Sequence, residues 1–308
     1  MEERKSKVMF EFAGGPVYQS DLSEEAIARL NEELVEEFKN EFNDERCRIA
    51  EAEVLTNQSL KKILEIALER DYEVHVIFSI MFNPNLEEID EKAWKNLSEH
   101  KDWKIRVLAA RSRVATNERL QEMLKHEMKK PDSYVVNAIL SNPNLREIDE
   151  DVWKDLSEHE DWMIRRGTAG SRCATNERLQ KMLKHEPKVE QSSFIIMFII
   201  KTILSNPNLR EIDEEVWKDL SEHEDWKIRV LAAESRFATR KRLVKMVEHE
   251  MENPDSMVME AIMFNKNFLS WKGKLQNNFK FTEKQLIKRR TLKFSVLLLN
   301  VRAKIKNI

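Results

Sequence analysis

Arginine recurs in this chain of 308 residues at a spacing that could carry chemistry. It stands four positions after an aspartate in each Asp-Trp-Xaa-Ile-Arg segment, which ends at Arg106, Arg165 or Arg229. Residues four apart meet on one face of a helix, so one interpretation is an Asp–Arg ladder that ties neighbouring repeats together. The alternative is a row of arginines that binds phosphates or acidic side chains of a partner.

Tryptophan and histidine also recur. A tryptophan at a fixed place in every repeat is expected to pack against the next repeat, although such a series could also stack on bases or anchor a peptide. The histidines recur near the expected ends of helices, where a cation or donor would cap exposed carbonyl groups. The repeated residues are Trp94, Trp103, Trp153, Trp162, Trp217, Trp226, His100, His126, His159, His185, His223 and His249.

The sequence does not favour a metal centre or a catalytic site. A single histidine beside a glutamate in each unit does not supply the close cluster that zinc requires. Cys47 and Cys173 are far apart and cannot form a disulfide framework or a four-thiolate site by themselves. No Gly-Xaa-Ser-Xaa-Gly segment, phosphate-binding loop or catalytic Cys/His signature is present in the sequence. We therefore expect a non-enzymatic protein with no metal and no cofactor.

These residues lie on a repeated pattern of short helices. Residues 142–162 recur as residues 206–226 with one substitution, and residues 83–103 are a looser copy. Each Asn-Pro step is expected to end a helix, because proline lacks an N–H donor and restricts the residue before it. The next helix can be capped by an aspartate. Expected capping residues are Asp90, Asp149 and Asp213 in these segments, and Thr56, Thr116, Thr175 and Thr239 before the leucine-bearing helices.

The spacing of the copies predicts a stacked array. Asn83 and Asn142 are 59 residues apart, and Asn142 and Asn206 are 64 residues apart. Units of about 30 residues, paired into periods of about 60, predict an all-α solenoid of helix-turn-helix repeats. The composition, with 35% charged residues and 5 glycines, is typical of helical proteins. We assign residues 1–45 to an acidic N-terminal cap with one helix, 46–265 to the array, and 266–308 to a basic, degenerate C-terminal cap.

The N-terminal cap has its own pattern. Residues 8–12 predict a short strand, and residues 14–16, Gly-Gly-Pro, predict a turn. From Ser23 to Phe42, apolar residues at helical spacing predict a helix whose N-cap is Asp21 or Ser23.

The segment from Asp102 to Leu124 resembles a unit of the leucine-rich repeat variant proteins. Those units read roughly Asp-Trp-x-Val-Arg-x-x-Ala-Ala-x-Asn-Pro before a leucine-bearing helix. Here Asn-Pro occurs in alternate half-units, whereas Ser-Arg replaces it in the others, as at Ser112-Arg113. The resemblance covers residues 46–265 and implies a right-handed solenoid related to HEAT repeats. A founding member carries an iron–sulfur cluster on clustered cysteines, which this chain lacks, so the cofactor is not expected here.

Places where the copies differ are the candidate partner-binding sites. Gly167-Thr-Ala-Gly170 stands where an earlier copy has Val107-Leu-Ala-Ala110, and two helical glycines predict a close backbone approach or a hinge. The run Phe194–Ile200 is apolar on every side, so it needs internal cover, a partner or a second copy of this chain. The candidate partner-binding residues are Arg165, Arg166, Gly167, Gly170, Arg172, Phe194, Ile195, Phe198, Ile199, Lys288, Arg289 and Arg290.

Charge is divided unequally along the chain. Residues 266–308 carry 12 Lys/Arg and one acid, a net charge of +11, which leaves −14 for residues 1–265 of the total of −3. The basic end indicates an anionic partner or attraction to the acidic body of the same chain. The N-terminus has no apolar stretch after its charges, and no run approaches the roughly 20 apolar residues that span a bilayer. We expect a cytoplasmic protein that does not contact a membrane.

These observations predict a non-enzymatic repeat scaffold, an adaptor or inhibitor that binds another protein through one face of the solenoid. The alternative is a nucleic-acid-binding protein that uses a concave face, as HEAT-like DNA glycosylases do. Its phosphate contacts would come from the basic C-terminus and from Arg113, Arg165, Arg166, Arg172 and Arg236. The charge of −14 opposes this alternative unless the positive charges segregate.

Overall fold

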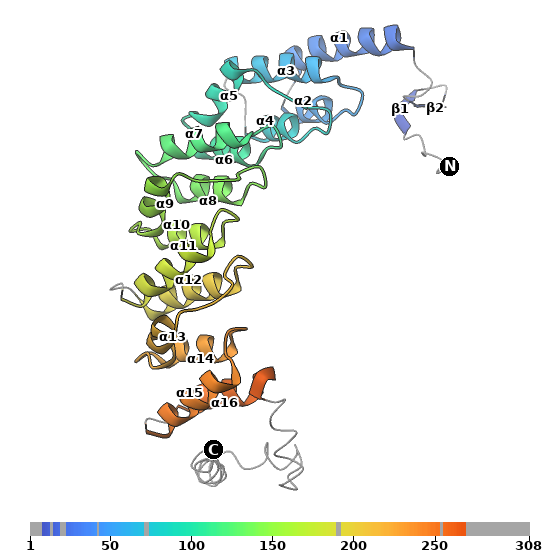
Figure 1. Cartoon of the computed structure of the whole chain (residues 1–308). Helices are drawn as coiled ribbons and strands as arrows, with labels where there is room; N and C mark the ends of the chain where they lie inside the picture. Colours follow the sequence, from blue (N-terminus) through green and yellow to red (C-terminus); the bar gives the residue numbers. More distant parts are fainter. Residues whose placement is uncertain are drawn as a thin grey trace. The chain divides into compact units, whose positions relative to one another are not determined.

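The fold is built almost entirely of short helices (Figure 1). The computed structural model describes residues 8–12, 15–18, 23–41, 43–70, 74–188, 192–252 and 255–268. The chain divides into two compact units, Met1–Cys173 and Ala174–Ile308, which are treated separately below. The division falls inside the segment that the sequence assigns to a single array. The helical content confirms the all-α expectation and is compatible with a helical repeat protein.

The first unit begins with a hairpin and a long helix. Strands β1 (Val8–Phe12) and β2 (Gly15–Tyr18) pair antiparallel, with Phe12 opposite Gly15, which confirms the predicted strand. Helix α1 (Glu24–Asn40) begins after Ser23, whose hydroxyl accepts a hydrogen bond from the Ala26 N–H at 3.2 Å. Ser23 is therefore the N-cap, which decides between the two candidates, Asp21 and Ser23, that the sequence offered.

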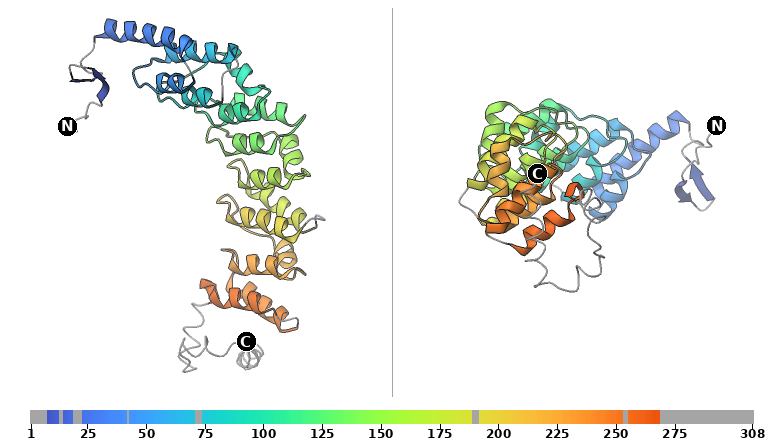
Figure 2. Two further views of the ribbon diagram at one scale, coloured as in Figure 1. Left: turned by 180° about the vertical axis from the view of Figure 1, so that it is seen from behind. Right: turned by 60° about the horizontal axis from the view of Figure 1, so that its bottom comes forward.

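The rest of the first unit alternates two kinds of helix. Consecutive helices form pairs, beginning with α2 and α3, and we call the earlier helix of each pair a first helix and the later one a second helix. Successive first helices pack against one another, as do α1 and α3, and α3 and α5 (Figure 1, Figure 2). The first helices are α2 (Asn43–Ala50), α4 (Val74–Met81), α6 (Trp103–Arg111), α8 (Ser133–Ser141) and α10 (Trp162–Gly170); the second helices are α3 (Asn57–Glu69), α5 (Glu91–Ser98), α7 (Asn117–Glu127) and α9 (Glu150–Ser157).

The second unit repeats this alternation. Its first helices pack in the order α12, α14, α16, and α11 packs against α13. Helix α12 has 13 residues where α8 has 9, and a 3-10 turn precedes it, so the longer spacing of 64 residues between Asn142 and Asn206 arises from a local lengthening of this repeat. The elements are α11 (Asn176–His185), η2 (Glu186–Lys188), α12 (Ser193–Ser205), α13 (Glu214–Ser221), α14 (Trp226–Glu234), α15 (Arg240–Glu252) and α16 (Ser256–Phe264).

Side-chain caps set where the helices begin. The four threonines accept hydrogen bonds from backbone N–H groups three residues later, as predicted; the Thr56 bond from Ser59 is 3.2 Å long. Asp90 caps α5 by accepting from the Ala93 N–H at 2.7 Å. Asp149 and Asp213 precede their helices without such a bond, so those two capping predictions are wrong.

A buried asparagine forms the centre of each Asn-Pro turn. The Asn142 Oδ1 accepts from the Asn144 N–H at 2.8 Å, which closes the turn after α8. Its Nδ2 donates to the carbonyls of Ala110 and Ser112, at 2.7 and 3.1 Å, at the end of the preceding first helix. One side chain thus ends α8 and ties it to α6. Asn83 donates to the Ala50 carbonyl at 2.7 Å. Asn265, which is followed by lysine instead of proline, makes the same bond to the Ala233 carbonyl at 2.7 Å.

Arginines complete these turns in the alternate repeats. Arg113 donates to the carbonyls of Asn83 and Leu86, at 2.6 and 3.0 Å. In the second unit, Arg236 donates to the Asn206 carbonyl at 2.7 Å. Both guanidinium groups bind the backbone of the previous Asn-Pro turn. This structural role argues against the phosphate-binding role that the sequence suggested for Arg113 and Arg236.

We predict that Asn142→Ala destabilises the protein by about 2–4 kcal/mol, because it removes the hydrogen bonds from Asn142 to two buried carbonyls and opens the turn after α8. Chemical denaturation would measure the free energy of unfolding. The matched control is Asn96→Ala on the exposed surface of α5, for which we expect a change within about 0.5 kcal/mol. Equal losses in the two variants would contradict the structural role of Asn142.

Candidate partner-binding face

The repeated arginines pair with glutamates rather than with the aspartates that precede them. The Arg106 Nε donates to the Glu127 Oε1 at 2.6 Å, and Asp102 instead accepts from the Lys104 N–H at 2.9 Å as the N-cap of α6. Arg229 and Glu250 form the same 2.6 Å pair in the second unit. The predicted Asp–Arg ladder is therefore wrong, because the capping bond uses the aspartate and a glutamate on the following second helix reaches the guanidinium.

The side chain of Arg165 is buried and does not reach the protein surface. It is 1% exposed, and its Nη1 donates to the carbonyls of His159 and Glu160 at 2.6 and 3.1 Å. A buried guanidinium needs such partners, since an unsatisfied charge in the core is costly. The prediction that Arg165 binds a partner, whether protein or phosphate, is therefore wrong.

The histidines and tryptophans separate into structural roles. His100 and His159 accept hydrogen bonds at 3.0 Å from the backbone N–H two residues later, so they close turns as acceptors rather than as the donors expected. Trp94 is buried beneath the Arg119 guanidinium, which lies 5.2 Å from its ring. Trp103, by contrast, is exposed. The packing interpretation therefore holds for Trp94 but does not account for Trp103.

Large apolar side chains are exposed on one kind of helix. In the described part of the first unit, all four lie on or directly after a first helix: Phe78, Phe82, Trp103 and Tyr134. Phe78 is 48% exposed and stacks on Phe82 with ring centres 4.6 Å apart. Tyr134 is 56% exposed and stacks on Trp103 at 5.0 Å, which bridges α6 and α8.

Positive charge accompanies these aromatic residues. Helices α4, α6, α8 and α10 contain no aspartate or glutamate, whereas residues 1–173 as a whole carry 37 acids against 26 Lys/Arg. Lys104, Arg111 and Arg166 are exposed on these helices. Within the described structure, the side chains of Lys104 and Arg111 form no ion pair. We call the exposed side of α4, α6, α8 and α10 the aromatic–cationic face.

Sequence reasoning found two residues of this face, Arg166 and Trp103, the latter as one of a tryptophan series that could anchor a partner, and missed its other aromatic residues. The missed residues are variable between copies, so a search for repeated motifs passes over them. The signal that could have found them is the absence of acids from four alternate helices in an acidic chain. The missed residues are Phe78, Phe82, Lys104, Arg111 and Tyr134.

Gly167 permits a close contact between two first helices. A Cβ at Gly167 would lie 1.9 Å from the Asn137 Oδ1 on α8. Asn137 donates to the Met163 carbonyl of α10 at 3.2 Å, so its amide lies over the glycine. This contact supports the close backbone approach, rather than the hinge, as the role of Gly167. Because α6 and α10 both begin at tryptophan, Gly167 corresponds to Leu108, one position from the alignment made on sequence.

The remaining predicted residues lie in several environments. In the first unit, Arg172 and Gly170 are exposed. In the second, Phe194 is 56% exposed and meets Phe198 edge to face at 4.7 Å, while Ile195 is partly exposed and Ile199 is fully buried. Internal packing therefore covers one side of the Phe194–Ile200 run and leaves Phe194 at the surface. Lys288, Arg289 and Arg290 lie outside the described residues.

A hydrogen-bonded aspartate links two first helices of the second unit. Asp225 caps α14 by accepting from the Lys227 N–H at 2.9 Å. Burial raises the pKa of Asp225, but this bond and a hydrogen bond from the Ser193 hydroxyl of α12 outweigh it, so its pKa lies below the ordinary value. The ionised carboxylate therefore favours the observed arrangement of α12 and α14.

No protein-family model, curated protein or solved structure compared with this chain matches it. Across the described residues, no group of three or more His, Cys, Asp or Glu side chains could hold a metal ion. None of the helices in this part of the chain has the length and apolarity needed to cross a membrane. The interpretation of the face therefore rests on its own geometry.

We predict that Gly167→Ala destabilises the protein by about 1–3 kcal/mol, because the added methyl group displaces the Asn137 amide. Combining it with Asn137→Ala should restore part of this loss, since the smaller side chain leaves room for the methyl group. A double-mutant cycle on the free energy of unfolding would measure this coupling. Gly170→Ala is the matched control and should be neutral or stabilising, because Gly170 is exposed. Additive effects at positions 137 and 167 would contradict the contact.

Proposed function

We propose that this chain is a non-enzymatic helical repeat scaffold that binds another protein through the aromatic–cationic face. The observation that carries the proposal is the exposure of four aromatic side chains on alternate helices of one unit. Exposed apolar patches on soluble proteins commonly mark interaction sites. Tryptophan, tyrosine and arginine are also the residues enriched among binding hot spots.

The arrangement of the face indicates the chemistry of its partner. Tyr134 on Trp103 and Phe82 on Phe78 present two stacked apolar anchors. Burying such rings supplies most of the affinity in protein interfaces. Lys104 and Arg111 add positive charge, which favours carboxylates and speeds association with an acidic surface. A partner segment with apolar side chains flanked by Asp or Glu would complement both features.

Further aspects of the proposal rest on the repeat pattern. We place the chain among leucine-rich repeat variant and HEAT-like proteins, because its Asp-Trp helix and Asn-Pro step resemble the units of that family. The resemblance implies a right-handed solenoid. Cys47 and Cys173 form no disulfide bond in the described structure, which suits a reducing compartment, so a cytoplasmic location belongs to the same proposal.

Selection of a random peptide display library against the full chain would test the proposed protein-binding face. We expect the selected peptides to combine Asp or Glu with aromatic or leucine side chains. The double variant Phe78→Ser, Tyr134→Ser should weaken these peptides at least about tenfold, since it removes one anchor from each stacked pair.

Two controls use matched residues elsewhere. Phe194→Ser removes an equally exposed aromatic side chain from the second unit and should leave peptide affinity unchanged. Arg111→Glu should weaken acidic peptides, whereas Lys92→Glu on the second helix α5 should not. Retention of full affinity in the Phe78/Tyr134 variant would refute this face as the binding site.

The second candidate function is binding of single-stranded nucleic acid. The observation that favours it is the absence of acids from α4, α6, α8 and α10, which is the charge segregation that this alternative requires. Aromatic side chains can stack on bases while neighbouring Lys and Arg contact phosphates. Arg166 would contribute here, whereas the structural arginines Arg113, Arg165 and Arg236 would not.

Fluorescence anisotropy with a labelled single-stranded oligonucleotide of about 20 nucleotides would test this second candidate. We expect affinity to fall at least about tenfold between 50 and 200 mM salt, because binding releases counterions. Arg111→Glu with Arg166→Glu should abolish it. No anisotropy change at 50 mM salt would exclude nucleic-acid binding by this face.

A further inference from the structure

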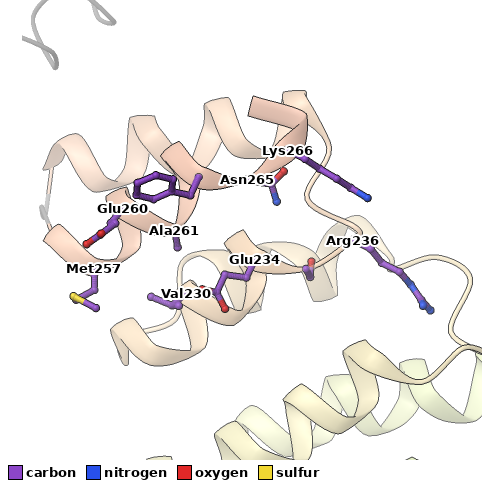
Figure 3. Close-up of a pocket in the computed structure, with 10 residues that line it drawn as sticks. Val230, Glu234, Arg236, Met257, Glu260, Ala261, Asn265 and Lys266 are labelled. Atoms are coloured by element: carbon purple, nitrogen blue, oxygen red, sulfur yellow. The ribbon is translucent and has the colours of Figure 1, made fainter. Parts of the chain in front are cut away.

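A groove of about 620 Å³ lies between α14 and α16 of the second unit (Figure 3). Its lining includes Met257 and Phe264, which are 50% and 68% exposed, together with Val230 and Ala261. Two large apolar side chains this exposed in one groove are a surface that other protein atoms are expected to cover.

Among the first helices of the second unit, exposed carboxylates occur at the groove, on α14 and α16, and not on α12. Helix α12 contains no acid, and its one charged residue is Lys201. Glu234 at the end of α14 and Glu260 within α16 are both exposed, and neither forms an ion pair within the described structure. In Figure 3, Glu260 lies near Met257, whereas Arg236 and Lys266 extend at the other end of the groove. The apolar end of the groove therefore carries negative charge.

The chain leaves the described structure beside this groove. Asn265 and Lys266 line it, and the described residues end at Phe268. Residues 269–308 carry 11 Lys/Arg against the single acid Glu283, and they include the apolar run Val296–Leu299. A segment tethered this close has an effective concentration in the millimolar range, so weak contacts suffice to hold it.

We propose that the groove between α14 and α16 is the docking site for the chain's own residues 269–308. Apolar side chains of the segment cover Met257 and Phe264, and its cations face Glu234 and Glu260. Apolar burial supplies most of the stabilisation, because exposed ion pairs contribute little individually. The segment thereby caps the last repeat, whose apolar surface no further helix pair covers in the described structure.

This docking also accounts for the charge division of the chain. The basic segment is attracted to the carboxylates of Glu234 and Glu260, although Arg236 and Lys266 line the other end of the groove, so the basic residues need not imply an anionic partner. The inference concerns the second unit and does not depend on the partner-binding face of the first unit.

Limited trypsin digestion of the full chain would test the docking, because the segment is rich in Lys and Arg. We expect Glu234→Gln with Glu260→Gln, or Phe264→Ser, to be cleaved within residues 269–308 at least about five times faster than the unaltered chain. Raising the salt to about 0.5 M should reduce the effect of the glutamine substitutions, because salt screens the ionic contribution.

The matched control is Glu248→Gln with Glu252→Gln, which makes the same charge change on the exposed surface of α15. Circular dichroism should show that every variant keeps its helices. Equal cleavage rates in the unaltered chain, the groove variants and the control would overturn the proposal.

A photo-crosslinking residue, p-benzoylphenylalanine, placed at position 264 would identify the occupant directly. We expect links to residues 269–308 of the same chain, found by mass spectrometry at the monomer mass. Links at the dimer mass would assign the groove to a second copy instead, and the absence of links to the segment would overturn the docking. A failed peptide selection against the first unit would leave these outcomes unaffected.

Discussion

The stacking of first helices depends on side-chain amides that satisfy the backbone of the preceding repeat. Each first helix ends with carbonyl groups that have no partner within the helix, and burying them unsatisfied would be costly. Asn142 closes its own turn and donates to the end of α6 at the same time. Arg113 makes the reciprocal contact with the turn after α4. The relative placement of these helices is therefore fixed by directional hydrogen bonds as well as by apolar packing.

Because the repeated side chains are used to hold neighbouring repeats together, the repeated residues and the candidate binding residues are different sets. Asparagines, arginines and capping threonines are used by the scaffold, so they recur and offer little to a partner. The position five residues before the closing Asn or Ser is free to vary. It holds Phe78, Val107, Asn137 and Arg166 on successive first helices of the first unit. Phe78 and Arg166 are exposed there, whereas Val107 and Asn137 are partly buried, so variation at this position lets one scaffold carry a face with its own chemistry.

The two units carry different surfaces on equivalent helices. In the first unit the aromatic–cationic face has no acid on four first helices, whereas in the second unit Glu234 and Glu260 lie at the apolar end of a groove whose other end holds Arg236 and Lys266. The difference suits two occupants of opposite charge: an acidic partner for the first unit and the chain's own basic segment for the second. Electrostatics then helps to keep each occupant at its own surface, because like charges across an interface are unfavourable.

The sequence by itself determined the helices, the threonine caps and the Asn-Pro turns, because neighbouring residues encode backbone angles and local hydrogen bonds. At Gly167 it offered a close approach or a hinge, and the Asn137 amide of another helix decided for the close approach. The tertiary structure decided which side chains are exposed. Asp102 and Arg106 have the spacing of an ion pair, yet capping uses the aspartate, and Glu127 lies 21 residues from its arginine. Arg165 is buried although the next residue, Arg166, is exposed on the same helix. Burial depends on what packs from other segments of the chain, and spacing within one helix does not specify that.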